Sequence, residues 1–538
     1  MLKGQQLNKM AKPSGKKSET NVFRIELRAN PDNQLALNSK IQQVKSILQR
    51  KCGRTVLKYE VLDTVLDKFL EREQSCKKEG FINHYVELDK QNCKHEKLIY
   101  TTNACLAKCM EIASHHKAYC TETLEMNNQK LQAFVTTCHF TCKNGHLYRW
   151  LSSPHLLGTG NFLINEKVLF SFHLSGMLES QFDRFSQALG TGRFPRRTND
   201  GFMRVFRDSV VSQYTSSIHN AQFMEVGLTS TGDCEAPIDI STDARHNCRK
   251  NSKDTSVVAL GNLSHKVLAC ENISKLDHPA AQKHEVIGCQ RVMDALASQN
   301  LFIGVWAHDF NTSVNKFVEG LPDPTQNQNE IWHCVKNLKK EIKNVAQGPK
   351  YSEGKAWHRQ LSDKVQSIAT HAHYAIRNCN QDPQELRDRL DAIVPHYSGV
   401  HDKCSSLSRC RTDANYEPSR LVVTDVHAQE LLTKAIKRTL LYKKPQNFCL
   451  ARDTCYVESF NNTVLMFTDK RISHSTVEYD TRIKLAVLHW NENVDRRCRS
   501  LQRIRNTKKV KKNLSECTFA YSELLWDTYL GNVAKTFE

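Results

Sequence analysis

The stretch Ile238-Asp239-Ile240-Ser241-Thr242-Asp243 opens the part of the chain that decides the fold. It is a short strand-like run, and it closes on a carboxylate. Residues 223–228 form a similar run just before it. Residues 255–260 and 266–269 follow with the pattern of a hairpin, because Gly-Asn stands between them. We therefore expect neighbouring strands in this region.

A helix and a further strand follow the predicted hairpin. Helical residues extend over 280–299, and residues 301–306 read as a buried strand that ends at His308-Asp309. Strand, hairpin, helix and strand is the order of an α/β sheet with mixed strand directions. Asp243 and Asp309 stand at or just past the ends of two strands, where open α/β sheets collect their sites.

A third carboxylate comes late in the chain, in Tyr456-Val457-Glu458-Ser459-Phe460-Asn461-Asn462. Glu458 heads a helix expected over 458–467, directly after a strand-like or linking segment, 455–457. Mg²⁺ prefers carboxylate oxygens, and phosphoryl transfer on nucleic acids commonly uses two divalent ions. The chain holds 57 acidic residues, so spacing alone does not single out this trio.

Several motifs together resemble DDE transposases and host proteins derived from them. They are Trp332-His333 at the start of a helical block, Gly145-His146 with Trp150 and Ser152-Ser153-Pro154, and Glu458-Ser459-Phe460-Asn461. The nearest patterns are Mutator-like and Kolobok-like, over roughly residues 138–495. The resemblance implies an RNase H-like mixed sheet interrupted by a helical insertion. We therefore expect an α/β fold with large all-α parts, preceded by a helical N-terminal region that its Cys/His spacing makes a candidate zinc-binding region.

The resemblance also implies a site. Asp243, Asp309 and Glu458 become the first, second and third acids, which hold Mg²⁺ or Mn²⁺, and Asn461 supports them. His333 matches the histidine of a pattern of Cys or Asp, two residues, then His, but Glu330 stands where Cys or Asp is expected. Two interpretations of His333 stay open: a role at the metal or in strand separation, and packing beside Trp332.

Three functions compete. The first is Mg²⁺-dependent DNA cleavage and strand transfer, with water or a 3′-hydroxyl as nucleophile. The second is a domesticated, catalytically inactive protein that binds DNA or chromatin. The third is a helical interaction protein whose zinc knuckles contact other proteins. DNA is the expected partner in the first two, and self-association is left open.

Cysteines and histidines gather between residues 93 and 160. The candidate zinc ligands there are Cys105, Cys109, Cys138, Cys142 and His146. Zinc needs four such ligands, which two pairs at four-residue spacing can supply. The alternative is that residues four apart share one helix face as ordinary buried thiols. In the helical block, His401 and Cys404, near His396 and Cys410, form a second candidate group.

A basic helix follows a turn in the pattern of a helix-turn-helix. Residues 180–189 form the first helix, 190–195 the turn, and Thr198 caps a helix through Val211. The candidate DNA-binding residues are Arg196, Arg197, Arg204 and Arg207. The alternative is a helical hairpin without DNA contact.

Composition agrees with a nucleic-acid partner. The net charge is +19 and the pI about 9.1, which favours a polyanion. Lysine clusters at 12–17 and 503–512 favour the nucleus. With mean hydropathy of −0.55 and no apolar run near the roughly 20 residues of a membrane span, we expect a soluble, non-secreted protein with reduced cysteines.

These inferences divide the chain into segments. They are a disordered basic tail (1–20), a helical N-terminal unit (21–92), a Cys/His-rich zinc module (93–160), a helical DNA-binding segment (161–220), the first part of the RNase H-like core (221–329), a helical insertion (330–445), the second part of the core with the third acid (446–500), and a basic C-terminal tail (501–538).

Overall fold

The structure is a computed structural model that describes residues 91, 96–156, 159–229, 236–247, 252–321, 325–503 and 510–537. The predicted basic tail (1–20) lies outside the described residues, as does the predicted helical unit (21–92) apart from Gln91. Residues 97–538 form one compact unit. No described helix combines the length and the apolar character that a membrane span requires.

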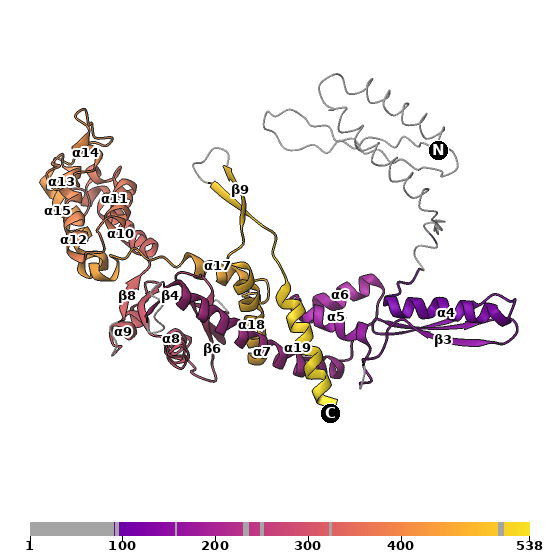
Figure 1. The fold of residues 1–538 in the computed structure, drawn as a ribbon. Helices are drawn as coiled ribbons and strands as arrows, with labels where there is room; N and C mark the ends of the chain where they lie inside the picture. Colours follow the sequence, from indigo (N-terminus) through magenta and orange to yellow (C-terminus); the bar gives the residue numbers. More distant parts are fainter. Residues whose placement is uncertain are drawn as a thin grey trace, which may run out of the picture. The chain divides into compact units, whose positions relative to one another are not determined.

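A five-stranded mixed sheet forms the centre of this unit, in the order β6-β5-β4-β7-β8 (Figure 1). Its strands are β4 (Ile238–His246), β5 (Asp254–Gly261), β6 (Val267–Ser274), β7 (Ile303–His308) and β8 (Gln326–Asn329). β4, β5 and β6 run antiparallel, whereas β4, β7 and β8 run parallel. The predicted mixed α/β class is therefore confirmed.

Helices cover both faces of the sheet, and every residue of β5 is buried. Val257 and Ala259 pack against α8 (Ala281–Ala297) on one face. Val258 and Leu260 face the core that α7 and α18 (Thr476–Asn493) share on the other. The covered sheet explains why these strands read as apolar runs rather than as alternating ones.

Helix α7 is longer than predicted. It spans Arg196–Leu228 and begins after Pro195, so the predicted strand over 223–228 is wrong. Buried residues continue at helical spacing into this segment, where Ala221, Gln222 and Glu225 are buried, while Phe223 is 83% exposed. Packing on the sheet and on α19 extends the helix past the point where its local sequence resembles a strand.

The predicted helical block, which follows β8 and precedes α17 (Cys455–Val464) along the chain, forms a bundle with its own core (Figure 1). Its helices are α10 (Ile331–Ala346), α11 (Val365–Arg377), α12 (Pro383–Asp391), α13 (Ile393–Tyr397), α14 (Arg409–Thr412), α15 (Val426–Arg438) and α16 (Leu440–Lys443). Leu338, Ile368 and Leu432 are fully buried in that core. Short helix α9 (Thr312–Glu319) precedes β8.

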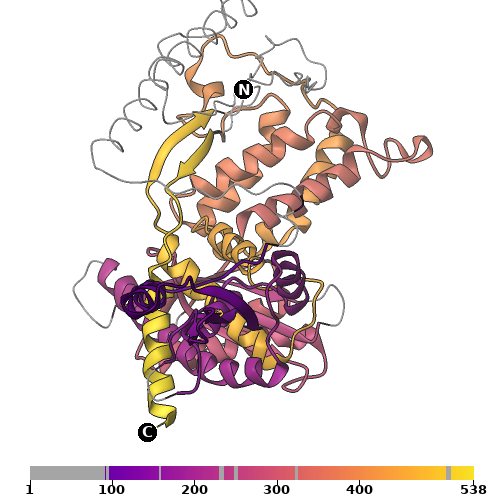
Figure 2. The same ribbon diagram turned by 90° about the vertical axis from the view of Figure 1, so that its right-hand side faces the viewer.

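Two late segments differ from the prediction. Helix α17 spans Cys455–Val464, so residues 455–457 are helical rather than strand-like or linking. The C-terminal segment is not only a basic tail: β9 (Cys498–Arg503) and β10 (Val510–Leu514) form a hairpin, drawn in yellow in Figure 2, and α19 (Ala520–Phe537) follows. Buried side chains of α19 belong to the same core as those of α7. The sequence does not predict this helix, because the basic run before it favours an exposed tail.

The N-terminal part of the unit is a small module. It consists of α4 (Asn103–Tyr119) and a three-stranded antiparallel sheet of β1 (Glu125–Gln132), β2 (Val135–Thr141) and β3 (Leu147–Leu151). Helices α5 (Leu163–Leu174) and α6 (Glu179–Leu189) connect the module to α7.

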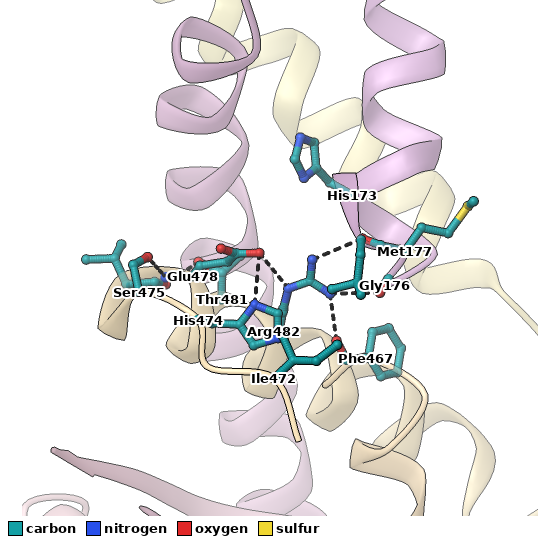
Figure 3. A network of polar contacts seen from close by, with 12 residues as sticks. His173, Gly176, Met177, Phe467, Ile472, His474, Ser475, Glu478, Thr481 and Arg482 are labelled. Carbon is teal, nitrogen blue, oxygen red and sulfur yellow. Dashed lines mark hydrogen bonds and ion pairs between the residues drawn. The ribbon is translucent and has the colours of Figure 1, made fainter. Parts of the chain in front are cut away.

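Buried Arg482 on α18 joins three segments (Figure 3). Its guanidinium donates to the carbonyls of Gly176 (2.7 Å), Met177 (3.0 Å) and Phe467 (2.7 Å). Its Nε also donates to Glu478 at 2.9 Å. Hydrogen bonding from His474, together with the Arg482 charge, lowers the pKa of Glu478 to about 2. Arg482 therefore links the connection between α5 and α6 to Phe467, which follows the C-terminal end of helix α17.

Replacing Arg482 with Met should destabilise the protein by about 3–5 kcal/mol, because Glu478 and the three carbonyls lose a buried cationic partner. Urea unfolding measures the difference. The matched control is Arg196→Met, which removes an exposed ion pair with Asp200 at 3.9 Å and should cost about 1 kcal/mol or less. Equal losses in the two variants would contradict the role given to Arg482.

Candidate metal centre

Strand register brings Asp243 and Asp309 side by side. β4 and β7 are parallel, and Thr242 pairs with His308 at the end of β7. Asp243 follows Thr242 and Asp309 follows His308, and neighbouring strands lie about 4.8 Å apart. Asp243 is not at the end of β4, which continues to His246 in its pairing with β5.

Helix α17 lies against β4 and β5, and its N-cap residue and one residue of its C-terminal half contact the two aspartates. Asn461 Nδ2 donates to Asp243 Oδ2 at 2.7 Å, and Thr454 Oγ1, at the N-cap, donates to Asp309 Oδ1 at 3.3 Å. Glu458 stands in the first turn of the helix and is exposed. Buried Val457 and Phe460 fix the helix on the core, so Glu458 is held on the open side.

The electrostatics of Asp243 show how closely the acids gather. Burial and the charges of Asp309, Glu285 and Glu458 raise the pKa of Asp243 to about 8. The hydrogen bond from the Ala244 amide, at 2.8 Å, opposes this rise and does not overcome it. The carboxylates of Asp309, Glu285 and Glu458 therefore lie near enough to Asp243 to raise its pKa.

Glu285 on α8 is an acid that the sequence analysis missed. It accepts a hydrogen bond from Asn311 Nδ2 at 2.7 Å, and burial followed by the charge of Asp309 raises its pKa. Its signal in the sequence is weak, because an acidic residue in the middle of a predicted helix normally faces solvent. Only the packing of α8 against the sheet turns it toward the centre.

His333 and Glu330 approach the centre from the start of α10. His333 Nδ1 lies 3.6 Å from Asp309 Oδ1 and contacts the Glu330 carboxylate. One ligand atom from each of Asp309, Glu330 and His333 lies within 4.8 Å of the others. Burial raises the pKa of Glu330, whereas the charge of His333 lowers it. His333 also packs against the ring of Trp332, with 4.8 Å between ring centroids, so its surroundings leave both interpretations open.

The donor set fits a hard divalent cation. Asp309, Glu330 and His333 offer two carboxylates and one imidazole whose ligand atoms lie within 4.8 Å of one another. The charges of Glu285 and Glu458 act on Asp243, the neighbour of Asp309 on β4. Burial, followed by repulsion from the neighbouring carboxylates, raises the pKa of Asp243. Mg²⁺ or Mn²⁺ would relieve this repulsion and would satisfy the oxygen donors.

Two Cys/His groups lie elsewhere. His401 and Cys404 meet His396 and Cys410, with His401 Nδ1 3.2 Å from His396 Nδ1 and Cys404 Sγ 3.4 Å from the same atom. In the N-terminal module, Cys142 and His146 meet His116 and Cys120. Neither His116 nor Cys120 is among the ligands predicted from the sequence.

Cys105, Cys109 and Cys138 are not part of the N-terminal group. Cys138 lies within β2, and about 3.3 Å per strand residue separates it from Cys142 by roughly 13 Å. Four-residue spacing brings ligands together on a helix or turn, but not along a strand. Cys138 is buried beside Cys109 instead, and burial followed by the charge of Cys109 raises its pKa.

The predicted DNA-binding arginines lie near the start of α7. Arg196, Arg197 and Arg204 are exposed, and Arg207 is half-buried. The opposite face of the helix is buried in the core. These arginines therefore line the outer face of a long core helix.

A basic cleft that the sequence analysis missed adjoins the acidic centre. Its volume is about 410 Å³, and Phe310, the residue after Asp309, lines it. Its cationic lining residues are Lys340 on α10, Arg438 on α15 and Lys443 on α16, and Glu341 on α10 is the acidic residue of the same lining. Tertiary packing of separate helices creates this charge cluster, which no local run of the sequence reveals.

Residues 315–410 match the family model of the Mutator-like transposase. The match extends from α9 through β8 and α10 to α14, and it includes Glu330, His333 and the group around His396. It confirms the predicted resemblance to Mutator-like transposases over this segment. No curated protein matches the chain.

Binding of Mg²⁺ should release a proton from Asp243, because a carboxyl with a pKa of about 8 is protonated at pH 7 and must lose its proton to act as a ligand. Apparent affinity should therefore rise by up to about tenfold per pH unit and level off above the pKa. Calorimetry in buffers of different ionisation enthalpy measures the release. Asp243→Asn should abolish it, whereas exposed Asp294→Asn on α8 should not. Affinity independent of pH would contradict the assignment.

Proposed function

We propose that the chain is a transposase-like protein that binds DNA, and that Asp243, Asp309 and Glu458 serve Mg²⁺-dependent DNA cleavage and strand transfer. The observation that carries the proposal is the pairing of Thr242 with His308, which makes Asp243 and Asp309 neighbours beneath α17. The family match over residues 315–410 supports the same function.

The architecture agrees with the proposal. A mixed sheet with a helical bundle between β8 and α17 is what an RNase H-like core with a helical insertion requires. The insertion separates the second acid from the third along the chain. The third acid lies on α17, which packs against β4 and β5. The proposal thus uses each part of the core.

The chain's own residues would bind and orient the reacting groups. Bound divalent ions supply charge neutralisation at the phosphodiester and activation of water or a 3′-hydroxyl. Asp243, Asp309 and Glu458 supply oxygen ligands. Asn461 and Thr454 fix the orientation of the two aspartates through their hydrogen bonds. His333 lies beside Asp309, where it can orient this carboxylate or contact a phosphate.

Charge supports DNA as the partner. The net charge is +19, and the basic cleft of Lys340, Arg438 and Lys443 lies next to the residue that follows Asp309. Each neutralised phosphate releases counterions, which favours binding to a polyanion. A nuclear location forms part of the proposal, on the basis of the lysine clusters at 12–17 and 503–512.

One observation favours the second candidate, a catalytically inactive DNA- or chromatin-binding descendant. Glu330 replaces the Cys or Asp of the resembling pattern, and its carboxylate contacts His333. This contact engages the Nδ1 atom that also lies 3.6 Å from Asp309. Glu330 in place of Cys or Asp alters the surroundings of Asp309, where catalysis would take place. It leaves the basic cleft of Lys340, Arg438 and Lys443 unchanged.

Asp309→Asn and Glu458→Gln should each reduce nicking or joining of duplex DNA by at least about a hundredfold, because loss of a metal-binding carboxylate removes several kcal/mol of charge stabilisation. The assay follows supercoiled DNA with Mg²⁺ or Mn²⁺, and Asp294→Asn is the control. Unchanged activity in either variant would contradict the trio. Salt-sensitive DNA retention without any nicking by the unaltered protein would establish the inactive alternative.

Lys340→Ala/Arg438→Ala should weaken DNA binding and reduce the slope of log affinity against log salt by about 0.9 for each phosphate that the two cations neutralise. Fluorescence anisotropy over a salt series measures both quantities. Lys339→Ala/Lys434→Ala is matched in charge and places its changes on the same two helices, outside the cleft. Arg196→Ala/Arg197→Ala tests the helix-turn-helix hypothesis in the same assay. Equal effects of the cleft double variant and the control double variant would contradict a role of the cleft in DNA binding.

A further inference from the structure

A turn between β2 and β3 brings a thiol and an imidazole to one place. Gly145 adopts a positive φ of 80°, and its amide donates to the Cys142 carbonyl at 3.0 Å. The Cys142 amide donates to the His146 carbonyl at 3.3 Å. The closed turn places Cys142 Sγ 3.3 Å from His146 Nδ1.

The end of α4 supplies two more soft or borderline donors. His116 lies in the last turn and Cys120 is the C-cap, so their spacing of four places them on one side of the helix end. Cys120 Sγ lies 3.9 Å from Cys142 Sγ. One ligand atom from each of the four residues lies within 4.8 Å of the others. Zn–S bonds of about 2.3 Å and Zn–N bonds of about 2.0–2.1 Å in a tetrahedron separate ligand atoms by roughly 3.3–3.8 Å.

His116 gives an independent indication of a ligand. Its side chain is only 3% exposed, and within the described part of the chain its Nε2 atom has no hydrogen-bond partner. A buried polar atom without a partner costs about 1–3 kcal/mol. A disulfide between Cys120 and Cys142 would require an S–S distance of about 2.05 Å and would leave this imidazole unsatisfied. A metal ion satisfies all four residues.

Packing explains why the module needs such a link. His116 is the one buried residue that α4 contributes. The helix is tied to the sheet by the Trp150 indole, whose Nε1 donates to the Cys105 carbonyl at 2.7 Å. Since apolar burial contributes little to holding α4 in place, we propose that His116, Cys120, Cys142 and His146 bind a structural Zn²⁺ ion that fastens α4 to the turn between β2 and β3. Two thiolates and two imidazoles suit zinc rather than the hard cation of the acidic centre.

Metal analysis of the full chain tests the site, and it is carried out in a Cys404→Ser/Cys410→Ser background so that the group around His396 does not contribute. This protein should carry about one zinc per chain. Adding Cys142→Ser should remove it, whereas adding Cys138→Ser, four residues away and outside the group, should leave it. Absence of zinc from the background protein, or its retention after Cys142→Ser, would overturn the proposal.

Thiol labelling of the unaltered full chain needs no variant to fold. Iodoacetamide should modify half-buried Cys142 only after a zinc chelator is added, whereas exposed Cys498 should react equally with and without chelator. Equal labelling of Cys142 in both states would overturn the proposal, as would a Cys120–Cys142 disulfide in the peptide map. Neither readout depends on DNA cleavage, so the outcome is separate from that of the proposed function.

Discussion

A buried cation on α18, Arg482, helps to hold the frame on which the acidic centre depends. Arg482 can be buried because Glu478 and three main-chain carbonyls meet its donors, which offsets the desolvation of its charge. One of these carbonyls belongs to Phe467, just beyond α17, and the close approach tolerates no side chain at Gly176, where a Cβ would lie 2.7 Å from the Met466 carbonyl. The α5–α6 connection thus limits how α17 can lie on the sheet.

Within this frame, backbone hydrogen bonds between β4 and β7 determine the positions of the two aspartates. The pairing of Thr242 with His308 fixes Asp243 relative to Asp309 without any side-chain contact between them. A shift of one residue in either strand would turn one aspartate to the opposite face. Core residues Val457 and Phe460 then orient α17 so that Asn461 reaches Asp243. The centre is therefore specified mainly by register and packing, and its side chains need little freedom.

The sequence predicts the features that local pattern encodes. Strands β4, β5 and β7 and helix α8 follow from apolar runs and turn residues, and the resemblance singles out Glu458 with Asn461. It does not predict β8, whose residues Gln326–Asn329 are polar because their side chains hydrogen-bond within the fold, as Asn327 does with His308. Nor does it predict Glu285 or His116, since helix packing alone brings them to their sites.

The crowding of carboxylates bears on whether the centre serves catalysis. Burial and three neighbouring acids raise the pKa of Asp243 to about 8, so the metal-free centre works against the stability of the fold at neutral pH. A DNA-binding surface requires none of this repulsion, because the basic cleft is built from other residues. Local conflicts of this kind are expected at functional sites, where a ligand relieves them. The arrangement therefore favours a centre that binds a cation over a set of acids without a ligand.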